Sequence, residues 1–286
     1  MDPLALALVL TAAVAHASWN LLSKKAAHVD SLVFVWLVAA AGAVVWSPLF
    51  AGFLLVARPR VGWQDLAVIG VSTAIHLGYF VLLQRGYGSG DLSVVYPVAR
   101  GTGPMLASLV AVLFLAERPS PVGIAGILLV GAGVFLMSGG VGQANLKGVA
   151  FGLVTGVFIA AYTVWDSRVV SAFAVAPILL NYLGEAGRAI ALAPFVLRGR
   201  RRALVAPAWR AHRRTIVAAA VLAFVSYLLV LVAFTRAPVS LVAPAREISV
   251  LIAVVLGGRL LAEDGVRHRL AAAGVIVGGV VAIALS

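Results

Sequence analysis

The chain has 286 residues, of which 63% are hydrophobic and 11% are charged, and its formal net charge is +12. This composition excludes an ordinary soluble domain, and the absence of cysteine excludes disulfides, thiolate metal sites and cysteine nucleophiles. A basic chain can bind nucleic acid, but these arginines fall between apolar segments, where they orient a membrane protein, so we expect no nucleic-acid partner.

Apolar segments of membrane-spanning length follow one another along the whole chain. A transmembrane helix needs about 20 apolar residues, so this length accommodates ten spans and short loops without a separate soluble domain. The predicted spans cover residues 4–22, 31–56, 64–83, 92–118, 123–137, 147–165, 172–197, 215–234, 240–262 and 270–285.

The first span is expected to be a retained helix and not a cleaved leader, because Asp2 and no basic residue precede it. His16, Trp19, Asn20 and Ser23 follow at helical spacing and form one polar stripe. The third span carries Ser72, His76 and Tyr79 on one face in the same way.

The fourth span contains a proline and an arginine, Pro97 and Arg100, and ends at Glu117. A proline inside a membrane helix frees a backbone carbonyl, and an arginine there costs about 2.5–3.5 kcal/mol on insertion scales, so both must face protein or a wet cavity. Pro244, Arg246 and Glu263 repeat this pattern in the ninth span, and we expect each copy to break at membrane depth.

The second half repeats other features of the first. In the sixth span Tyr162, Thr163 and Asp166 correspond to Trp19, Asn20 and Ser23, and in the eighth Tyr227 corresponds to Tyr79. The seventh span places Asn181, Glu185 and Arg188 on one face. A strongly basic stretch, residues 198–214, is predicted to be the loop before the eighth span. Gly274-x3-Gly278 in the tenth is a helix-packing pattern or a dimer interface.

These motifs, HASWNLLSKKA, YPVARGTGP…FLAERPS and APAREIS…LLAED, resemble those of the drug/metabolite transporter superfamily in its EamA-type ten-helix form. The resemblance covers essentially the whole chain. It implies an all-α integral membrane protein of ten transmembrane helices, built as two five-helix repeats at residues 1–139 and 146–286. Because five is odd, the second repeat enters the membrane inverted, which is the architecture of secondary carriers with a substrate site at the midplane.

Two interpretations of the buried charges remain open. Arg100 and Arg246 bind a carboxylate or phosphate of the substrate, or else they neutralise Glu185 and Glu247 and satisfy the carbonyls that the prolines free. Glu185 can also pair locally with Arg188. The candidate substrate-binding residues are Arg100, Arg246, Glu247, His16, Trp19, Asn20, Tyr79, Tyr96, Tyr162, Thr163 and Tyr227, and the candidate proton-coupling residues are Glu247 and Glu185.

The resemblance implies a secondary active transporter that moves a small polar metabolite, amino-acid-like or organic-acid-like, by alternating access. Mixed charge in the site favours a zwitterion whose ammonium group competes with a proton for a carboxylate, hence proton-coupled export. We expect a multi-pass protein of a cell membrane, the bacterial inner membrane, acting without a cofactor as a monomer or homodimer. The alternatives are a channel-like facilitator and an integral-membrane enzyme, although no His-x3-His pair, phosphate-binding glycine loop or serine with an adjacent base is present.

The basic residues also bear on orientation. Fourteen of the 22 lie in the loops after the odd-numbered spans and five in the other loops. The positive-inside rule then predicts that both termini lie outside, whereas the family resemblance implies that both lie inside.

Overall fold

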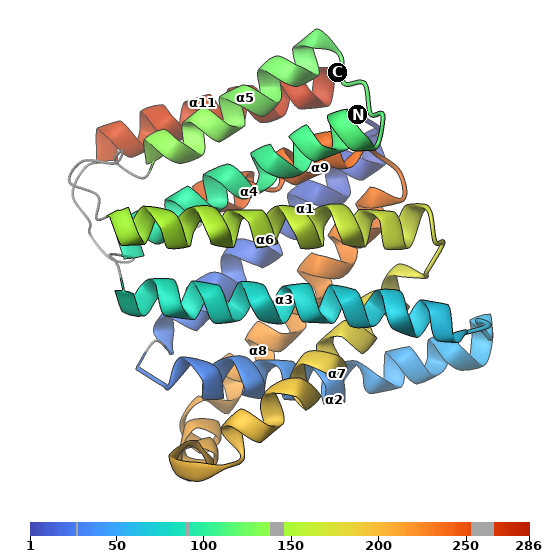
Figure 1. Cartoon of the computed structure of the whole chain (residues 1–286), viewed down its shortest axis with the longest axis vertical. Coiled ribbons are helices and arrows are strands. Elements are labelled where there is room, and N and C mark those ends of the chain that lie inside the picture. Colours follow the sequence, from blue (N-terminus) through green and yellow to red (C-terminus); the bar gives the residue numbers. More distant parts are fainter. Residues whose placement is uncertain (27, 90–91, 138–145, 253–265) are drawn as a thin grey trace.

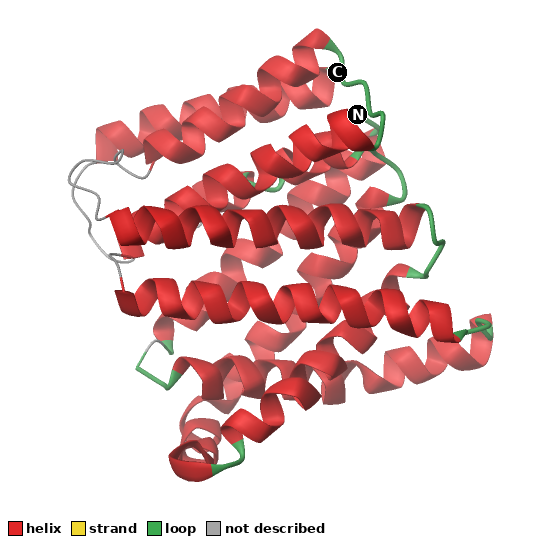
Figure 2. Ribbon diagram, in the orientation of Figure 1, coloured by secondary structure: helices red, strands yellow, loops and turns green. Residues whose placement is uncertain are grey.

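The computed structural model describes residues 1–26, 28–89, 92–137, 146–252 and 266–286 (Figure 1). Within these ranges the regular secondary structure is entirely helical (Figure 2). The helices are α1 Pro3–Lys25, α2 Ser31–Ala57, α3 Trp63–Ser89, α4 Leu92–Phe114, α5 Pro121–Met137, α6 Leu146–Ser171, α7 Pro177–Val196, η1 Gly199–Arg201, α8 Arg202–Phe234, α9 Val239–Ala245 and α11 Val266–Leu285.

Several of these helices are long and apolar enough to cross a membrane. Among the described residues, five segments meet that description, in α1, α2, α3, α6 and the η1–α8 segment, and shorter apolar stretches occur in α4, α5 and α11. Figure 1 shows α5 and α11 side by side at one edge of the bundle and α2 and α7 at the other, with α1, α3, α6 and α8 between them. The chain is therefore a multi-pass, all-α membrane protein.

Local signals in the sequence explain where these helices begin and end. Asp30 caps α2 by accepting hydrogen bonds from the backbone N–H groups of Leu32 and Val33, at 3.0 and 3.1 Å. Pro177 opens α7 at a position where a missing N–H costs nothing. Most of the short connections contain proline, glycine or polar residues, but the one between α6 and α7, residues 172–176, is apolar and ends at Pro177.

The break predicted in both proline-containing spans occurs in only one of them. A turn at Arg246 and Glu247 separates α9 from the helical residues 248–252, as expected. In the first copy, however, α4 runs uninterrupted from Leu92 to Phe114, so the predicted break there is wrong. Pro97 lies within the first two turns of α4, where a proline removes few helical hydrogen bonds and the remaining turns continue the helix.

The carbonyl freed by Pro244 finds a partner on another helix. Proline leaves the carbonyl four residues earlier without its helical donor, and that group is the Ser240 carbonyl. The Ser108 hydroxyl on α4 lies 2.9 Å from it and equally close to the Pro104 carbonyl on its own helix. A serine, and not one of the arginines considered from the sequence, therefore satisfies this buried group.

Glu117, which follows α4, caps the start of α9. Its two carboxylate oxygens accept the backbone N–H groups of Val239 and Ser240, at 3.0 and 2.9 Å. The free N–H groups and positive dipole end of a helix favour an anion at this position. This contact ties the first repeat to the second. The corresponding Glu263 lies outside the described residues.

The basic stretch is not the loop that the sequence indicates. α8 begins at Arg202 and includes most of it, 13 residues before the predicted start of the eighth span. Arginine is a good helix former, and an apolar set including Ala208 and Ile216 is buried on the inner face while the arginines face outward. Of the arginines in this basic stretch, only Arg201, just before α8, forms an ion pair with an acid among the described residues. Its partner is Asp30, at 3.3 Å.

Glycine permits a very close crossing of α5 and α11. A Cβ on Gly279 would lie 2.8 Å from the Gly126 carbonyl oxygen, and one on Gly126 would lie 2.7 Å from the Gly279 carbonyl oxygen. By contrast, a Cβ on Gly274 or Gly278 would meet no described atom within 4 Å. Gly274-x3-Gly278 thus does not pack within the described part of the chain, and Gly279 provides the helix contact.

The two chain ends lie together at one end of the bundle (Figure 1). The Met1 ammonium group donates to the Ala284 carbonyl at 3.4 Å. An even number of membrane crossings places both ends on one side, so this proximity agrees with ten spans.

Candidate functional site

A cavity of about 150 Å³ opens between the helices in the middle of the bundle. Its walls come from both halves of the chain: α1, α2, α3 and α4 from the first and α6, α7, α8 and the break after α9 from the second. The lining residues are His16, Trp19, Phe34, Val35, Val38, Ala39, His76, Tyr79, Phe80, Arg100, Tyr162, Glu185, Arg188, Ala223, Ser226, Tyr227 and Arg246.

One wall of the cavity is an aromatic cluster. His76 of α3 stacks on Tyr162 of α6 with ring centroids 4.3 Å apart, and Tyr227 of α8 meets His76 edge-on at 5.5 Å. Tyr79, one turn after His76, contacts Tyr162 edge-on at 5.7 Å. Offset or edge-on geometry is preferred for such pairs, so three helices are fixed here around a flat apolar surface with polar edges.

The polar stripe on α1 divides between the cavity and its own helix. His16 and Trp19 line the cavity and contact each other, the indole N–H donating to His16 Nδ1 at 3.2 Å. The Asn20 side chain instead donates to the His16 carbonyl at 2.9 Å, a bond within α1. Asn20 and the buried Thr163 do not line the described cavity. The Tyr96 side chain lies outside the described residues.

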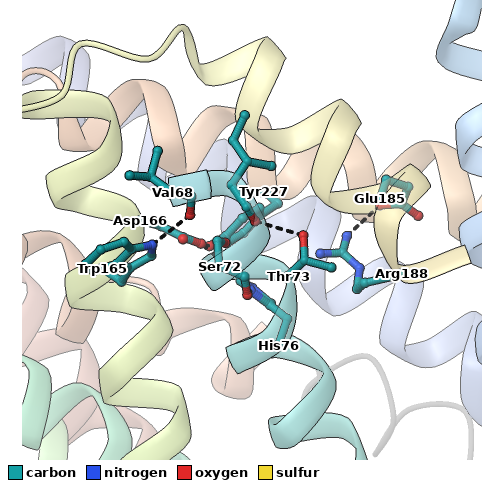
Figure 3. Close-up of polar contacts among 10 residues, drawn as sticks. Val68, Ser72, Thr73, His76, Trp165, Asp166, Glu185, Arg188 and Tyr227 are labelled. Atoms are coloured by element: carbon teal, nitrogen blue, oxygen red, sulfur yellow. Dashed lines mark hydrogen bonds and ion pairs between the residues drawn. The ribbon is translucent and has the colours of Figure 1, made fainter. Parts of the chain in front are cut away.

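Two arginine–glutamate pairs lie in the core of the site. Glu185 and Arg188, one turn apart on α7, form an ion pair at 2.8 Å (Figure 3). Arg100 reaches Glu247 at 3.1 Å and also donates to the Ser249 hydroxyl at 3.3 Å. All four side chains are mostly buried. Such pairing lowers the cost of placing charge at membrane depth.

Gly42 of α2 makes room for the Glu185 carboxylate. A Cβ at position 42 would lie 2.9 Å from Glu185 Oε1, closer than ordinary side chains approach. Hydrogen bonds from Trp36 to the Ala189 carbonyl and from Tyr182 to the Ala43 carbonyl, at 3.0 and 3.1 Å, hold α2 against α7 beside it. The position of Glu185 is thus set by two helices.

Arg246 is the cavity arginine with no carboxylate partner among the described residues. Its guanidinium lies over the Tyr227 ring, 6.0 Å from the centroid. The turn that interrupts the helix at Arg246 and Glu247 sends these adjacent side chains in different directions, Glu247 to Arg100 and Arg246 to the cavity. A positive charge with a fork of donors therefore faces the open space, where it can bind an oxyanion.

Sequence reasoning gave too little weight to several residues of this site. His76 and Arg188 were not among the candidate substrate-binding residues, yet both line the cavity. Phe34, Phe80 and Ser226 carried no signal, because single aromatic or hydroxyl residues are common on membrane helices. The four-residue spacings of Ser72 with His76 and of Tyr162 with Asp166 were usable signals, since each pair shares a helix face.

Comparison with known proteins gives three findings. The model of the EamA-like transporter family matches this chain twice, at residues 3–139 and 146–285. No curated protein matches it. A solved structure titled "Crystal structure of protein" is similar to it with a TM-score of 0.74 at 20% sequence identity, over 98% of this chain and 96% of that one. At that identity the likeness supports the fold alone.

Proposed function

Because the chain belongs to the EamA-like transporter family, we propose that it is a secondary active transporter that moves a small polar metabolite out of the cell by alternating access, coupled to protons. Membership makes it a membrane transporter of the drug/metabolite superfamily. The substrate, the direction and the coupling are our proposal, as is its place in a bacterial inner membrane.

The observation that carries the proposal is Arg246. It faces a cavity shared by the two repeats and has no acidic partner among the described residues, whereas Arg100 and Arg188 each have one. Arg246 is half-buried. A cation at membrane depth without a counter-charge is costly, and a substrate carboxylate that binds it offsets that cost. The aromatic wall beside Arg246 suits the flat or apolar body of such a substrate.

Carboxylates in the same site favour a substrate that also carries an ammonium group. Glu185 lines the cavity beside Arg188, and Glu247 lies behind Arg100. A zwitterion would place its carboxylate on Arg246 and its ammonium group toward a glutamate. An ammonium group and a proton would then compete for one carboxylate, which is the requirement for exchange of substrate against protons.

The proposal is tested with purified protein in proteoliposomes. A thermal-shift screen of amino acids, organic acids and amines first identifies a ligand, whose radiolabelled form is then followed in counterflow. Saturable counterflow that is lost in Arg246→Gln supports the carrier. Uptake that does not saturate and shows no counterflow would indicate a channel instead, and conversion of the ligand to a new product would indicate an enzyme.

A second measurement addresses the coupling. In weakly buffered detergent solution, binding of the identified ligand is expected to release protons. The release should disappear when Glu185→Gln and Glu247→Gln are combined. Proton uptake on binding contradicts exchange and indicates cotransport of an anion with a proton.

A further inference from the structure

Asp166 of α6 is a carboxylate deep in the bundle to which the roles above give no task. Its side chain is fully buried. One oxygen, Oδ2, accepts a hydrogen bond from the Tyr227 hydroxyl, and the Ser72 hydroxyl faces the same carboxylate (Figure 3). The other oxygen, Oδ1, is buried and has no hydrogen-bond partner among the described residues.

Asp166 differs from both glutamates in having no arginine. Glu185 lies 2.8 Å from Arg188 and Glu247 lies 3.1 Å from Arg100. In the described part of the chain, no lysine or arginine comes within ion-pair distance of Asp166, and the nearest basic atom is His76 Nε2 at 3.9 Å. A buried carboxylate without a cation is neutralised most simply by a proton.

The orientation of His76 leaves room for that proton. His76 Nδ1 lies 2.9 Å from the Ser72 carbonyl oxygen, and because a carbonyl can only accept, Nδ1 carries the hydrogen. In the neutral ring Nε2 is then a lone-pair acceptor, and it faces Asp166. At 3.9 Å these two atoms are not hydrogen-bonded, and two acceptors that face each other repel. A proton on Asp166 removes this repulsion, because the protonated carboxyl can donate toward Nε2.

The groups around Asp166 connect this position to the cavity. His76 from α3 and Tyr227 from α8 line the cavity, whereas Asp166 lies behind them (Figure 3). Tyr162, one turn earlier on α6, stacks on His76. Arg188 of α7 and Arg246 beyond α9 act on Asp166 only at longer range. From α4, which also packs on α6, the charged side chain is Arg100, which is paired with Glu247.

We propose that Asp166, reached through His76, is a proton-binding site in the wall of the transport cavity. A proton from cavity water passes by way of His76 Nε2 and forms an O–H bond on Asp166, leaving a neutral acid beside a neutral imidazole. Tyr227 donates its hydroxyl to this acid and carries the guanidinium of Arg246 over its ring, so the proton and a substrate anion would bind on either side of one side chain. This inference rests on the proposed proton-coupled transport, to which it adds a third carboxylate.

Infrared spectroscopy tests the proposal without a substrate. Protein labelled with ¹³C on the aspartate side-chain carboxyl is reconstituted in liposomes, and difference spectra are taken between alkaline buffer and mildly acidic buffer, in which exposed aspartates stay ionised. The wild type should gain a label-sensitive acid C=O band that is lost in Asp166→Asn. The same band should persist in the combined Glu185→Gln and Glu247→Gln variant and in Asp65→Asn, whose aspartate is half-buried at the start of α3 and accepts the Gly62 backbone N–H.

His76→Phe provides a second measurement. Because phenylalanine cannot accept a hydrogen bond, the C=O band of the protonated Asp166 should move to higher frequency. If the band is still present in a folded Asp166→Asn protein, the proposal is overturned. The infrared test needs no substrate. Absence of the band would therefore contradict the proton site without contradicting transport, and absence of counterflow would contradict transport without removing the band.

Discussion

Arg100 and Arg246 occupy related positions in the two repeats but stand in different surroundings. Arg100 is held by Glu247 and Ser249, whereas Arg246 lies over Tyr227 and faces the cavity. We therefore assign Arg100 to structure and Arg246 to substrate binding. This asymmetry has separable consequences for stability and for transport.

Arg100→Gln is expected to destabilise the protein, because it leaves Glu247 buried without its partner, at a cost of about 3–5 kcal/mol. Adding Glu247→Gln to Arg100→Gln should restore much of the thermal stability. Arg246→Gln should leave the melting temperature nearly unchanged while removing ligand binding. Melting curves of the four proteins in detergent check this, and equal melting losses in both single arginine variants would refute the distinction.

Gly42→Ala tests whether the position of Glu185 matters. The added methyl group would lie 2.9 Å from Glu185 Oε1 and should push that flexible side chain away from Arg188. We expect weaker ligand binding with little loss of stability, since the side chain can move and the backbone need not. Gly52→Ala on the same helix is the control, because a Cβ there meets nothing within 4 Å. Identical binding by the two variants would contradict the prediction.

At the scale of helices, apolar length was enough to locate the spans in the described residues, and the starts of α2 and α7 came from local signals, Asp30 and Pro177. About half of the predicted ninth span lies outside those residues. The sequence could not give the start of α8, because arginines that look like a loop also cover the outer face of a helix. It could not distinguish Pro97, which α4 tolerates, from Pro244, near which the helix breaks. That difference depends on contacts between helices, such as the one from Ser108 on α4 to the Ser240 carbonyl, and the sequence of a single segment does not show them.

The same limit applies to the site. Charged residues at membrane depth marked Arg100, Arg246 and Glu185 correctly as interior, because few other places accept a charge. The sequence allowed the arginines to neutralise Glu185 and Glu247 and allowed Glu185 to pair with Arg188. It could not show which pairs form, because Arg100 and Glu247 meet across 147 positions of sequence. The sequence also could not show which polar side chains of α1 face the cavity. Asn20 donates to a carbonyl of its own helix, whereas His16, one turn away, lines the cavity.

The crossing of α5 and α11 depends on Gly279 and not on its neighbour Gly278. Gly279→Leu would force the two backbones apart and is expected to cost about 1–3 kcal/mol, the usual price of overpacking. Gly278→Leu should be neutral, because a Cβ at Gly278 meets no atom of the described residues within 4 Å. Thermal melting of both variants measures the difference. A larger loss for Gly278→Leu would mean that this face packs against another molecule.

At the scale of the whole molecule, the basic loops decide how the bundle is oriented. Half of the fourteen residues on the more basic side lie within residues 198–214, so this one segment dominates the charge bias. On the positive-inside rule we expect that side in the cytosol and both termini outside. Two fusions at the C-terminus, one of fluorescent protein and one of phosphatase, measure this. We expect active phosphatase and no fluorescence; fluorescence with inactive phosphatase would place the C-terminus in the cytosol and reverse our assignment.

The contact between Met1 and Ala284 means that the polypeptide nearly closes on itself. A short flexible linker would join the two ends, and the chain could then be cut between the two family matches, after residue 139 and before residue 146. Such a circular permutant would be synthesised with the second repeat first, yet it would contain the same helix contacts. If the permutant folds, the order in which the two repeats are synthesised is not needed to build this bundle.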